Sequence, residues 1–261
     1  MTGLLRREQS GAVLRLILSD EATRNSLSET MLAELRDALV VDASVHVIII
    51  AATGSAFSSG HNLKELTAHR TDTDKGAAYF ERIFSTCSAL MISISHHRCA
   101  VIAEVDGLAS AAGCQLVASC DLAYASPRAR FCTPGVNIGL FCSTPMVPLS
   151  RTIHAKQAME MLLLGDAQDA DFALSAGLIN GIVSQNELSS HVNGLAHKIA
   201  AKSQAAISYG KRLFHDQHPL PLADAYALTS RIMVANMLDG AACEGLSAFI
   251  KKRQAQWPKL S

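Results

Sequence analysis

The chain has 261 residues, of which 49% are hydrophobic and 18% are charged, and its 23 lysines and arginines balance its 23 aspartates and glutamates. This length suits one large α/β domain or two smaller ones, and the composition argues against global disorder. The formal charge of zero, with no basic run beyond "KKR" at 251–253, argues against nucleic-acid binding, and near-neutral charge with much apolar surface favours self-association.

The cysteines and the apolar runs bear on the cellular compartment. The seven cysteines form no CxxC pair, and no stretch has the composition of a signal peptide or the ~18 consecutive apolar residues of a membrane span. We therefore expect a reducing compartment, cytoplasmic by default and mitochondrial in a eukaryote, with no membrane association. The run "HHRC" at 96–99 lacks a second half with zinc-ligand spacing, so no metal site is expected.

The first part of the chain alternates between predicted strands and predicted helices. Apolar and β-branched runs predict strands at 12–20, 46–53, 99–107 and 121–126. Helical periodicity predicts helices at 25–40, 63–66 and 77–94, the first of them with Ser28 as its N-cap. This alternation favours parallel βαβ units, and hence an α/β core.

From Ala155 onward the pattern predicts helices only, at 155–165, 169–177, 187–203, 222–238 and 243–257. The chain shows no internal sequence repeat and no low-complexity linker. We therefore predict a β/α core over 1–195, followed by a helical C-terminal region over 196–261.

Two loops rich in small residues carry the chemistry. "AFSSGHNLKEL" at 56–66 and "DGLASAAGCQL" at 106–116 each follow a predicted strand and open a helix. Backbone N–H groups at such a helix start are free to hold an anion or an oxyanion. The alternative is that each loop is only a tight turn whose small residues serve packing.

These loops, together with "GDAQDADFALSAGLINGIV" and the terminal "EGLSAFIKKRQ", give the chain a resemblance to the enoyl-CoA hydratase/isomerase family along almost its whole length. One branch of the family shares the sequence motifs "AAGCQLVASCD" and "PGVNIGLFCSTP". The resemblance implies an α/β crotonase (ClpP-like) fold, with a repeated ββα superhelical core and a helical C-terminal trimerisation region. It also implies a homotrimer or hexamer that binds acyl-CoA, with a coenzyme A thioester as substrate or ligand and no tightly bound cofactor.

The resemblance also assigns roles to particular residues. The backbone N–H groups of His61 and Ala112 correspond to the two donors that hold the thioester oxygen, and one such donor is worth roughly 10²–10³ in rate. The role of the His61 imidazole is left open. The ring either lies on the surface or forms its hydrogen bonds within the protein, or it makes a polar contact near the thioester. Coenzyme A contacts are implied for Arg24, Ala56, Ser59, His61 and Lys64, and from a neighbouring subunit for Phe249 and Lys252.

The chain departs from the family at two positions. Family hydratases carry glutamates where this sequence has Gln115 and Gly135. An amide cannot accept a proton from water and glycine offers no side chain, so we expect hydratase activity to be weak or absent. Residues considered as substitute acids or bases are Glu65, Glu81, Glu104, Asp106 and Cys142, and none of them restores a matched acid–base pair. The resemblance places Glu81 on the helix that caps the acyl pocket, so it stays open as a candidate single base.

Two functions remain open from the sequence. The chain is either an enzyme whose chemistry needs mainly oxyanion stabilisation, such as decarboxylation or isomerisation of an acyl-CoA, or a non-catalytic CoA-ester binder or assembly partner in acyl-CoA metabolism. Both predict affinity for a CoA thioester, and turnover separates them.

Overall fold

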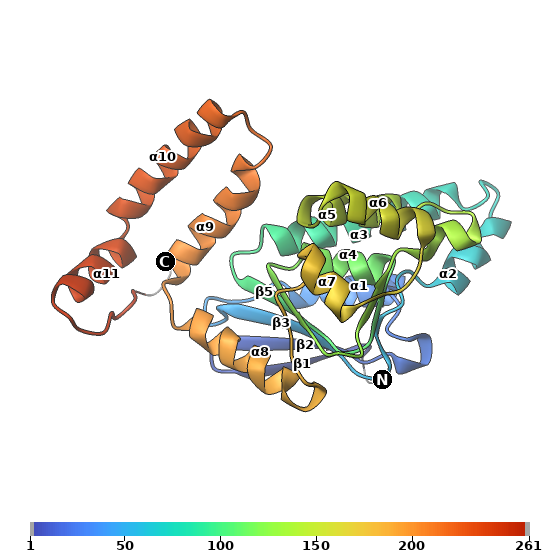
Figure 1. Ribbon diagram of the computed structural model, residues 1–261, viewed down its shortest axis with the longest axis horizontal. Coiled ribbons are helices and arrows are strands. Elements are labelled where there is room, and N and C mark those ends of the chain that lie inside the picture. The colour runs from blue at the N-terminus through green and yellow to red at the C-terminus, as the bar shows by residue number, and fades with distance from the viewer. Residues whose placement is uncertain (1–2, 259–261) are drawn as a thin grey trace.

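A six-stranded sheet forms the centre of the molecule in the computed structural model, which describes residues 3–258 (Figure 1). Its strands, in spatial order, are β1 (Leu5–Ser10), β2 (Val13–Leu18), β3 (Val47–Ala52), β5 (Ala100–Val105), β7 (Leu122–Ala125) and β10 (Gly181–Ile182). β1 pairs antiparallel with β2, and every other pair of neighbours is parallel. Because β3 and β5 are buried on both faces, their sequences read as continuous apolar runs.

A second, smaller sheet holds β4 (Ala56–Ser58), β6 (Leu108–Ser110), β8 (Arg130–Cys132) and β9 (Gln168–Asp169). The chain alternates between the two sheets, passing from β3 to β4, from β5 to β6 and from β7 to β8. After each pair it enters a helical element: α2 (Leu63–Ala68), α4 (Ala112–Ser119) and the 3₁₀ turn η3 (Pro134–Ile138), respectively. This is the repeated ββα unit that the family resemblance implies.

Helices cover both faces of the larger sheet, and the core accordingly has two layers. On one face, Ile48 and Ile50 of β3 pack in a cluster that includes buried residues of α1 (Glu29–Ala38), α3 (Ala77–Ser95) and α4. On the other face, Val47 and Ile49 pack against α8 (Gln185–Ala200). The remaining helices of this part are α5 (Ser143–Thr152), α6 (Ala155–Leu164) and α7 (Ala170–Ala176), with 3₁₀ turns η1 (Glu21–Thr23) and η2 (His69–Thr71).

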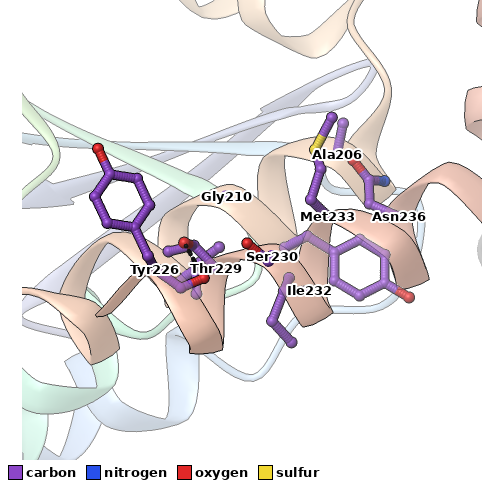
Figure 2. A pocket seen from close by; sticks show the side chains of 10 residues that line it. Ala206, Gly210, Tyr226, Thr229, Ser230, Ile232, Met233 and Asn236 are labelled. Carbon is purple, nitrogen blue, oxygen red and sulfur yellow. Dashed lines mark hydrogen bonds between the residues drawn. The ribbon is translucent and has the colours of Figure 1, made fainter. Parts of the chain in front are cut away.

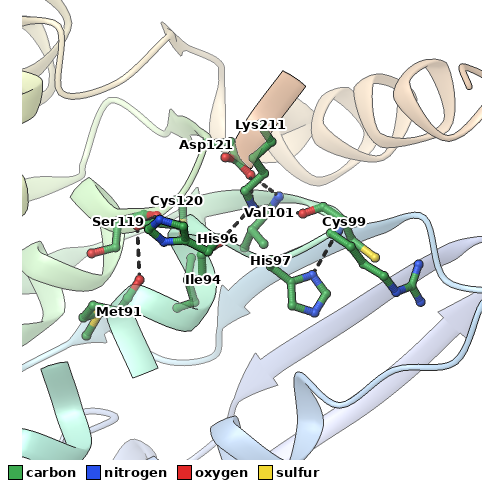
Figure 3. Close-up of polar contacts among 12 residues, drawn as sticks. Met91, Ile94, His96, His97, Cys99, Val101, Ser119, Cys120, Asp121 and Lys211 are labelled. Atoms are coloured by element: carbon green, nitrogen blue, oxygen red, sulfur yellow. Dashed lines mark hydrogen bonds and ion pairs between the residues drawn. The ribbon is translucent and has the colours of Figure 1, made fainter. Parts of the chain in front are cut away.

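The last three helices form an arm that projects away from this core (Figure 1). They are α9 (Gln204–Gln217), α10 (Leu222–Leu238) and α11 (Gly240–Ile250). Lys211 of α9 anchors the arm, because its Nζ lies 2.7 Å from Asp121 Oδ2 and donates to the carbonyl oxygens of Ile94 and Cys99 at 2.8 and 3.0 Å (Figure 3). A single ammonium group thus ties α9 to three separate segments of the core.

The predicted elements of the first part are confirmed, and Ser28 caps α1 by accepting a hydrogen bond from Met31 N at 3.1 Å. The prediction of helices only after Ala155 is wrong, since the structure adds the two-residue strands β9 and β10. These strands form by pairing with β8 and β7, and they are too short to give a periodic sequence pattern. Sequence reasoning also missed β1, the strands of the smaller sheet, α5 and α9. The proposed boundary at 195/196 falls inside α8, and residues 259–261 of the second region lie outside the described residues.

Candidate active site

The two small-residue loops meet directly in the folded chain. Gly60 has φ +86°, and a Cβ placed on it would lie 2.9 Å from Ser110 O and 3.2 Å from Ala112 N. Only glycine adopts this backbone conformation without strain and leaves room for the second loop. The N–H groups of His61 and Ala112 are therefore brought to neighbouring positions by two segments about fifty residues apart in the sequence.

The start of α4 is pressed against the smaller sheet. A Cβ on Gly113 would lie 2.3 Å from Ser58 O, so no other residue fits there without movement of the backbone. Ala111, which precedes the helix, has φ +49° and ψ −115°, a conformation that a side chain disfavours. Its N–H donates to Cys132 O at 2.9 Å, which fixes this strained turn to β8.

Within residues 3–258, neither the His61 N–H nor the Ala112 N–H donates a hydrogen bond to the protein. Ala112 is the first residue of α4, where the helix leaves its N–H groups without intrahelical acceptors. The helix dipole adds positive potential at this end. Two free amides beside one another are what an oxyanion needs, because they stabilise negative charge without reorganisation.

Gln115 follows Ala112 by one turn of α4, so it lies on the same face of the helix as that amide. Its side chain is 3% exposed, and its Oε1 is buried with no hydrogen-bond partner among the described residues. A buried amide oxygen without a donor costs about 1–3 kcal/mol. The side chain is suited to hydrogen bonding with a bound molecule, but it cannot take a proton.

Gly135 lies in η3, and neighbouring atoms occupy the space that a side chain at this position would need. A Cβ on this residue would lie 2.9 Å from Leu140 O and 3.0 Å from Cys142 Sγ. The Leu140 N–H donates to Gly135 O at 2.9 Å, so the loop 135–142 folds back on itself. The volume that a glutamate would use at this position is therefore filled by the protein.

The other acidic residues considered from sequence do not supply a base at the two amides. The oxygens of Glu65 accept from Glu29 N, Asn62 Nδ2 and the Tyr79 hydroxyl. Glu104 pairs with Arg15 at 2.9 Å, and Glu81 lies on an exposed part of α3.

Asp106 and Cys142 are likewise unsuited to this role. Although burial opposes the shift, hydrogen bonds from Arg128 and Ser126 hold the pKa of Asp106 below its ordinary value, so it stays an ion-paired carboxylate. Burial raises the pKa of the Cys142 thiol, which stays protonated and unreactive.

The His61 imidazole has one ring nitrogen in a hydrogen bond and the other without a partner among the described residues. Its Nδ1 lies 3.4 Å from Leu27 O, and its Nε2 is buried without a hydrogen-bond partner within residues 3–258. The ring meets Phe84 of α3 edge to face, with centroids 5.2 Å apart. Burial lowers the pKa of His61 below its ordinary value, and the Leu27 carbonyl partly opposes this, so the ring is neutral near pH 7.

The residues implied in coenzyme A binding fall into two groups. Arg24, Ala56, Ser59 and Lys64 lie near the first loop: Ser59 N donates to Arg24 O at 3.0 Å, and both Arg24 and Lys64 are exposed. Phe249 and Lys252 lie at the end of α11 on the arm, which points away from the loops of their own chain (Figure 1).

Sequence reasoning missed Asn25, which organises the first group. Its Nδ2 donates to Thr53 O and Ala56 O, both at 2.8 Å, and its Oδ1 accepts from Asp20 N at 2.8 Å. Arg24 and Asn25 both have positive φ, at 57° and 53°. Asparagine tolerates this region better than most residues, and an asparagine three residues before the predicted N-cap, Ser28, was the available signal.

A hollow of about 430 Å³ lies elsewhere, between α9 and α10 (Figure 2). Its lining is largely apolar, with Tyr209, Tyr226 and Met233 among its residues, and it lacks the free amides and orphaned polar atoms of the loops. In the described part of the chain, no group of three or more His, Cys, Asp or Glu side chains is placed to hold a metal ion. None of the helices described over 3–258 is long and apolar enough to span a membrane.

Solved structures superpose on this chain over nearly its whole length. The crystal structure of human enoyl-CoA hydratase domain-containing protein 3 matches with a TM-score of 0.92 and 45% identity, covering 97% of this chain and 100% of that one. That of an enoyl-CoA hydratase from Mycobacterium smegmatis matches with a TM-score of 0.91 and 42% identity, covering 97% and 98%. The molecule therefore has the crotonase fold, as predicted.

The family model described as enoyl-CoA hydratase/isomerase matches residues 8–259. A curated protein of Xenopus laevis, named "Enoyl-CoA hydratase domain-containing protein 3, mitochondrial", is 46% identical over 253 residues, which are 96% of this chain and 84% of that protein. The chain belongs to the enoyl-CoA hydratase/isomerase family. The similarity to this protein and to its human counterpart confirms the predicted branch of the family, the one that shares the motifs "AAGCQLVASCD" and "PGVNIGLFCSTP".

Proposed function

We propose that this protein binds an acyl-CoA and polarises its thioester between the N–H groups of His61 and Ala112. The observation that carries the proposal is the meeting of the two loops, which leaves both amides unpaired at neighbouring positions. Arg24, Ala56, Ser59, His61 and Lys64 belong to or adjoin the first of these loops, as coenzyme A contacts would require.

A proline substitution tests this assignment at a single atom. Proline is well tolerated at the first position of a helix but lacks the N–H, so Ala112→Pro removes one of the two donors. The readout is the ultraviolet absorbance of the enolate of bound acetoacetyl-CoA, which an oxyanion site enriches. We expect the enolate fraction to fall at least tenfold in Ala112→Pro and to persist in the matched variant Ala112→Gly, which keeps the N–H.

An enolate signal that is equal in the two variants, with folding confirmed by circular dichroism, would refute the assignment. Ala112→Leu gives a second, steric test, since Ala112 is buried and a bulky residue there blocks docking of the thioester carbonyl. Unchanged acyl-CoA affinity in that variant would contradict the placement.

The second part of the proposal is that hydration of an enoyl thioester is weak or absent. Hydration needs one group to activate water and one to protonate the α-carbon, and each is worth about 10²–10⁴ in rate. Gln115 supplies no proton acceptor, and the space beside Gly135 is occupied by Leu140 O and Cys142 Sγ. We expect crotonyl-CoA to be hydrated at least a thousandfold more slowly than by a relative that carries both glutamates.

Turnover at ordinary hydratase speed by the native protein would overturn this second part and leave the binding proposal intact. The remaining chemistry is then that of an oxyanion site, such as decarboxylation or isomerisation of an acyl-CoA. The alternative is a non-catalytic binder or assembly partner, favoured by the loss of both carboxylates. A panel of acyl-CoAs that bind without any conversion would select this alternative.

We propose further that the protein assembles as a trimer or hexamer through its arm. Phe249 is 84% exposed and Leu238 is 79% exposed, which is unusual for large apolar side chains unless a partner covers them. In such an assembly Phe249 and Lys252 reach the coenzyme A of a neighbouring subunit.

The compartment that we propose is a reducing one, the cytoplasm in a bacterium and the mitochondrion in a eukaryote. All seven cysteines are free thiols, and the animal relatives carry "mitochondrial" in their names. Fractionation of the source cells is the direct test.

A further inference from the structure

The side-chain amide of Gln115 is the polar group of α4 that the protein leaves unsatisfied. Every residue of α4 except Ala118 is buried, and Gln115 and Ser119 carry the polar side chains among them. The Ser119 hydroxyl is satisfied, because it donates to Gln115 O at 2.8 Å. Within residues 3–258 no residue pairs with the Gln115 amide, and its Oε1 is shielded from solvent as well.

Such a group is exceptional, since buried polar side chains in folded proteins are almost always hydrogen-bonded. Because the described part of the chain holds neither end of the Gln115 amide, the amide can turn about its last side-chain bond, whose torsion is broad in glutamine. A bound molecule that offers a hydrogen-bonding atom would satisfy it. Gln115 is therefore suited to recognising a polar atom of a ligand.

The geometry of α4 sets where that atom lies. Gln115 follows Ala112 on the same face of the helix, about 4.5 Å further along the axis. Helical side chains lean toward the N-terminus of their helix, so the long Gln115 side chain covers the turn that presents the Ala112 N–H. The Gln115 amide is thus directed toward the acyl group of a thioester whose oxygen accepts from Ala112.

The elements that carry the two loops select an uncharged partner for this amide. No Asp, Glu, Lys or Arg occurs in β4, β6, α4 or η3. A carboxylate brought among them would lose its water without gaining a cation. A carbonyl oxygen is neutral and only accepts hydrogen bonds, so it pairs with the Nε2 donor of glutamine.

We propose that Gln115 determines specificity by donating from Nε2 to a carbonyl oxygen on the third carbon of the acyl group, so that the site selects 3-oxoacyl-CoA. This inference rests on the proposed thioester site and adds the substrate class to it. One carbon separates the two carbonyl groups of a 3-oxoacyl thioester. When the first accepts from Ala112, the second therefore lies close to the side chain one turn further along α4.

The test compares acetoacetyl-CoA with butyryl-CoA, which have equal acyl length and differ in the oxygen on the third carbon. Calorimetry under mildly acidic conditions, which keep acetoacetyl-CoA in its keto form, gives the Kd of each. We expect the native protein to bind acetoacetyl-CoA about fivefold more tightly or better, as one hydrogen bond allows. In Gln115→Met, which keeps the side-chain length without a donor, the ratio of the two Kd values should fall to about one.

Gln115→Leu is a second variant without a donor and should give the same ratio, so the test does not depend on the folding of one variant. The matched control is Gln204→Met, which alters another buried glutamine, one whose Nε2 donates to Arg98 O at the base of the arm. This control should keep the native ratio. The thermal midpoint of ligand-free Gln115→Met should rise, because the substitution removes an unpaired buried amide.

Three results would overturn the inference and leave thioester binding intact. They are equal affinity of the native protein for the two ligands, a preference that survives in both Gln115 variants, and a lower thermal midpoint in Gln115→Met, which would mean that the protein itself engages the amide. Failure of both ligands to bind the native protein would remove the proposed function together with this inference.

Discussion

At the scale of single residues, the turn into α4 combines a strained backbone with an alanine. Ala111 has φ +49° and ψ −115°, and such conformations cost about 1–3 kcal/mol in a residue other than glycine. The alanine therefore stores strain next to the two free amides.

We predict that Ala111→Gly stabilises the protein by about 1 kcal/mol, because relief of strain exceeds the extra chain entropy of glycine, roughly 0.5–1 kcal/mol. Urea unfolding measures this change in the free energy of unfolding. The matched control is Ala118→Gly in the last turn of the same helix, where no strain is relieved and a loss of up to about 1 kcal/mol is expected. Equal losses in the two variants would show that Ala111 is not strained.

The close packing of Leu140 O and Cys142 Sγ against Gly135 predicts an effect of substitution on stability. A Cβ there meets Leu140 O and Cys142 Sγ at 2.9 and 3.0 Å, so Gly135→Ala should cost about 1–3 kcal/mol through overpacking. Removing one of the two obstacles with Cys142→Ala should recover part of that cost in the double variant, as measured by thermal unfolding. Additive losses would mean that the sulfur is not the obstacle.

At the scale of elements, the attachment of α9 depends on one ion pair, between the buried Lys211 side chain and the partly exposed Asp121 carboxylate. The Lys211 side chain is 6% exposed, and its three acceptors all belong to the core. Burial raises the pKa of Asp121 and Lys211 opposes this shift, so the carboxylate relies on its partner to remain charged. Figure 3 shows the pair with its neighbouring carbonyl groups.

We predict that Lys211→Met lowers the free energy of unfolding by about 1–3 kcal/mol, since it leaves the partly exposed Asp121 carboxylate without its counter-charge and two carbonyl oxygens without their donor. Guanidinium unfolding followed by circular dichroism measures the loss. Adding Asp121→Asn removes the stranded charge and should restore a substantial part of the stability. A double variant as unstable as Lys211→Met would mean that packing of the lysine stem, and not the charge, holds the arm.

The segment after α11 is held by a second ion pair. Arg253 donates to Glu244 at 2.6 and 2.8 Å, Gln256 N donates to the same carboxylate, and Trp257 Nε1 donates to Ala201 O at 2.9 Å. The hydrogen bonds from Arg253 and Gln256 lower the pKa of Glu244 from 4.5 to about 2. The folded-state pKa is lowered, so this carboxylate's contribution is complete above about pH 4.5 and is lost as the pH falls through about 2.

Fluorescence of Trp257, the single tryptophan, reports on this segment. We expect a constant signal from pH 7 to about pH 4.5 and a change only in stronger acid, with far-UV circular dichroism as the check on global unfolding. Glu244→Gln should show the released signal already at pH 7. A native transition near pH 4.5 would indicate that Arg253 does not hold the carboxylate.

At the scale of the whole molecule, the arm exposes large apolar side chains to water, which is unfavourable in a monomer. Leu222, Met233, Leu238, Phe249 and Ile250 are all largely exposed, and the hollow between α9 and α10 lies on the same arm (Figure 2). A partner subunit would remove this surface from water, and each large side chain buried contributes about 1.5–3 kcal/mol.

We therefore predict a trimer-based mass by light scattering at micromolar concentration. Leu238→Asp should reduce the mass to that of a monomer, because a charge at the covered surface is costly to bury. Val40→Asp is the matched control, since Val40 is 80% exposed on the core rather than on the arm. A monomeric native protein would contradict this and would remove the role of Phe249 and Lys252 across a subunit boundary.

Sequence alone determined the elements whose signals are local. The continuous apolar run of β3, the periodic face of α1 and the Ser28 cap are properties of a few consecutive residues, so they were predictable without the fold. The family motifs likewise determined the ββα repeat and the identity of the two loops. The absence of glutamate at positions 115 and 135 could also be read directly from the sequence.

Tertiary structure decided what depends on contacts between distant segments. The strands of the smaller sheet are two or three residues long, too short for a periodic signal, and they exist because β4, β6, β8 and β9 pair with one another. Burial and the absence of a partner on His61 Nε2 and Gln115 Oε1 come from packing around the loops, as does the block beside Gly135. The sequence showed which residues stand at the site, and the fold decided which of their atoms are free, because hydrogen-bond satisfaction depends on neighbours far apart in the chain.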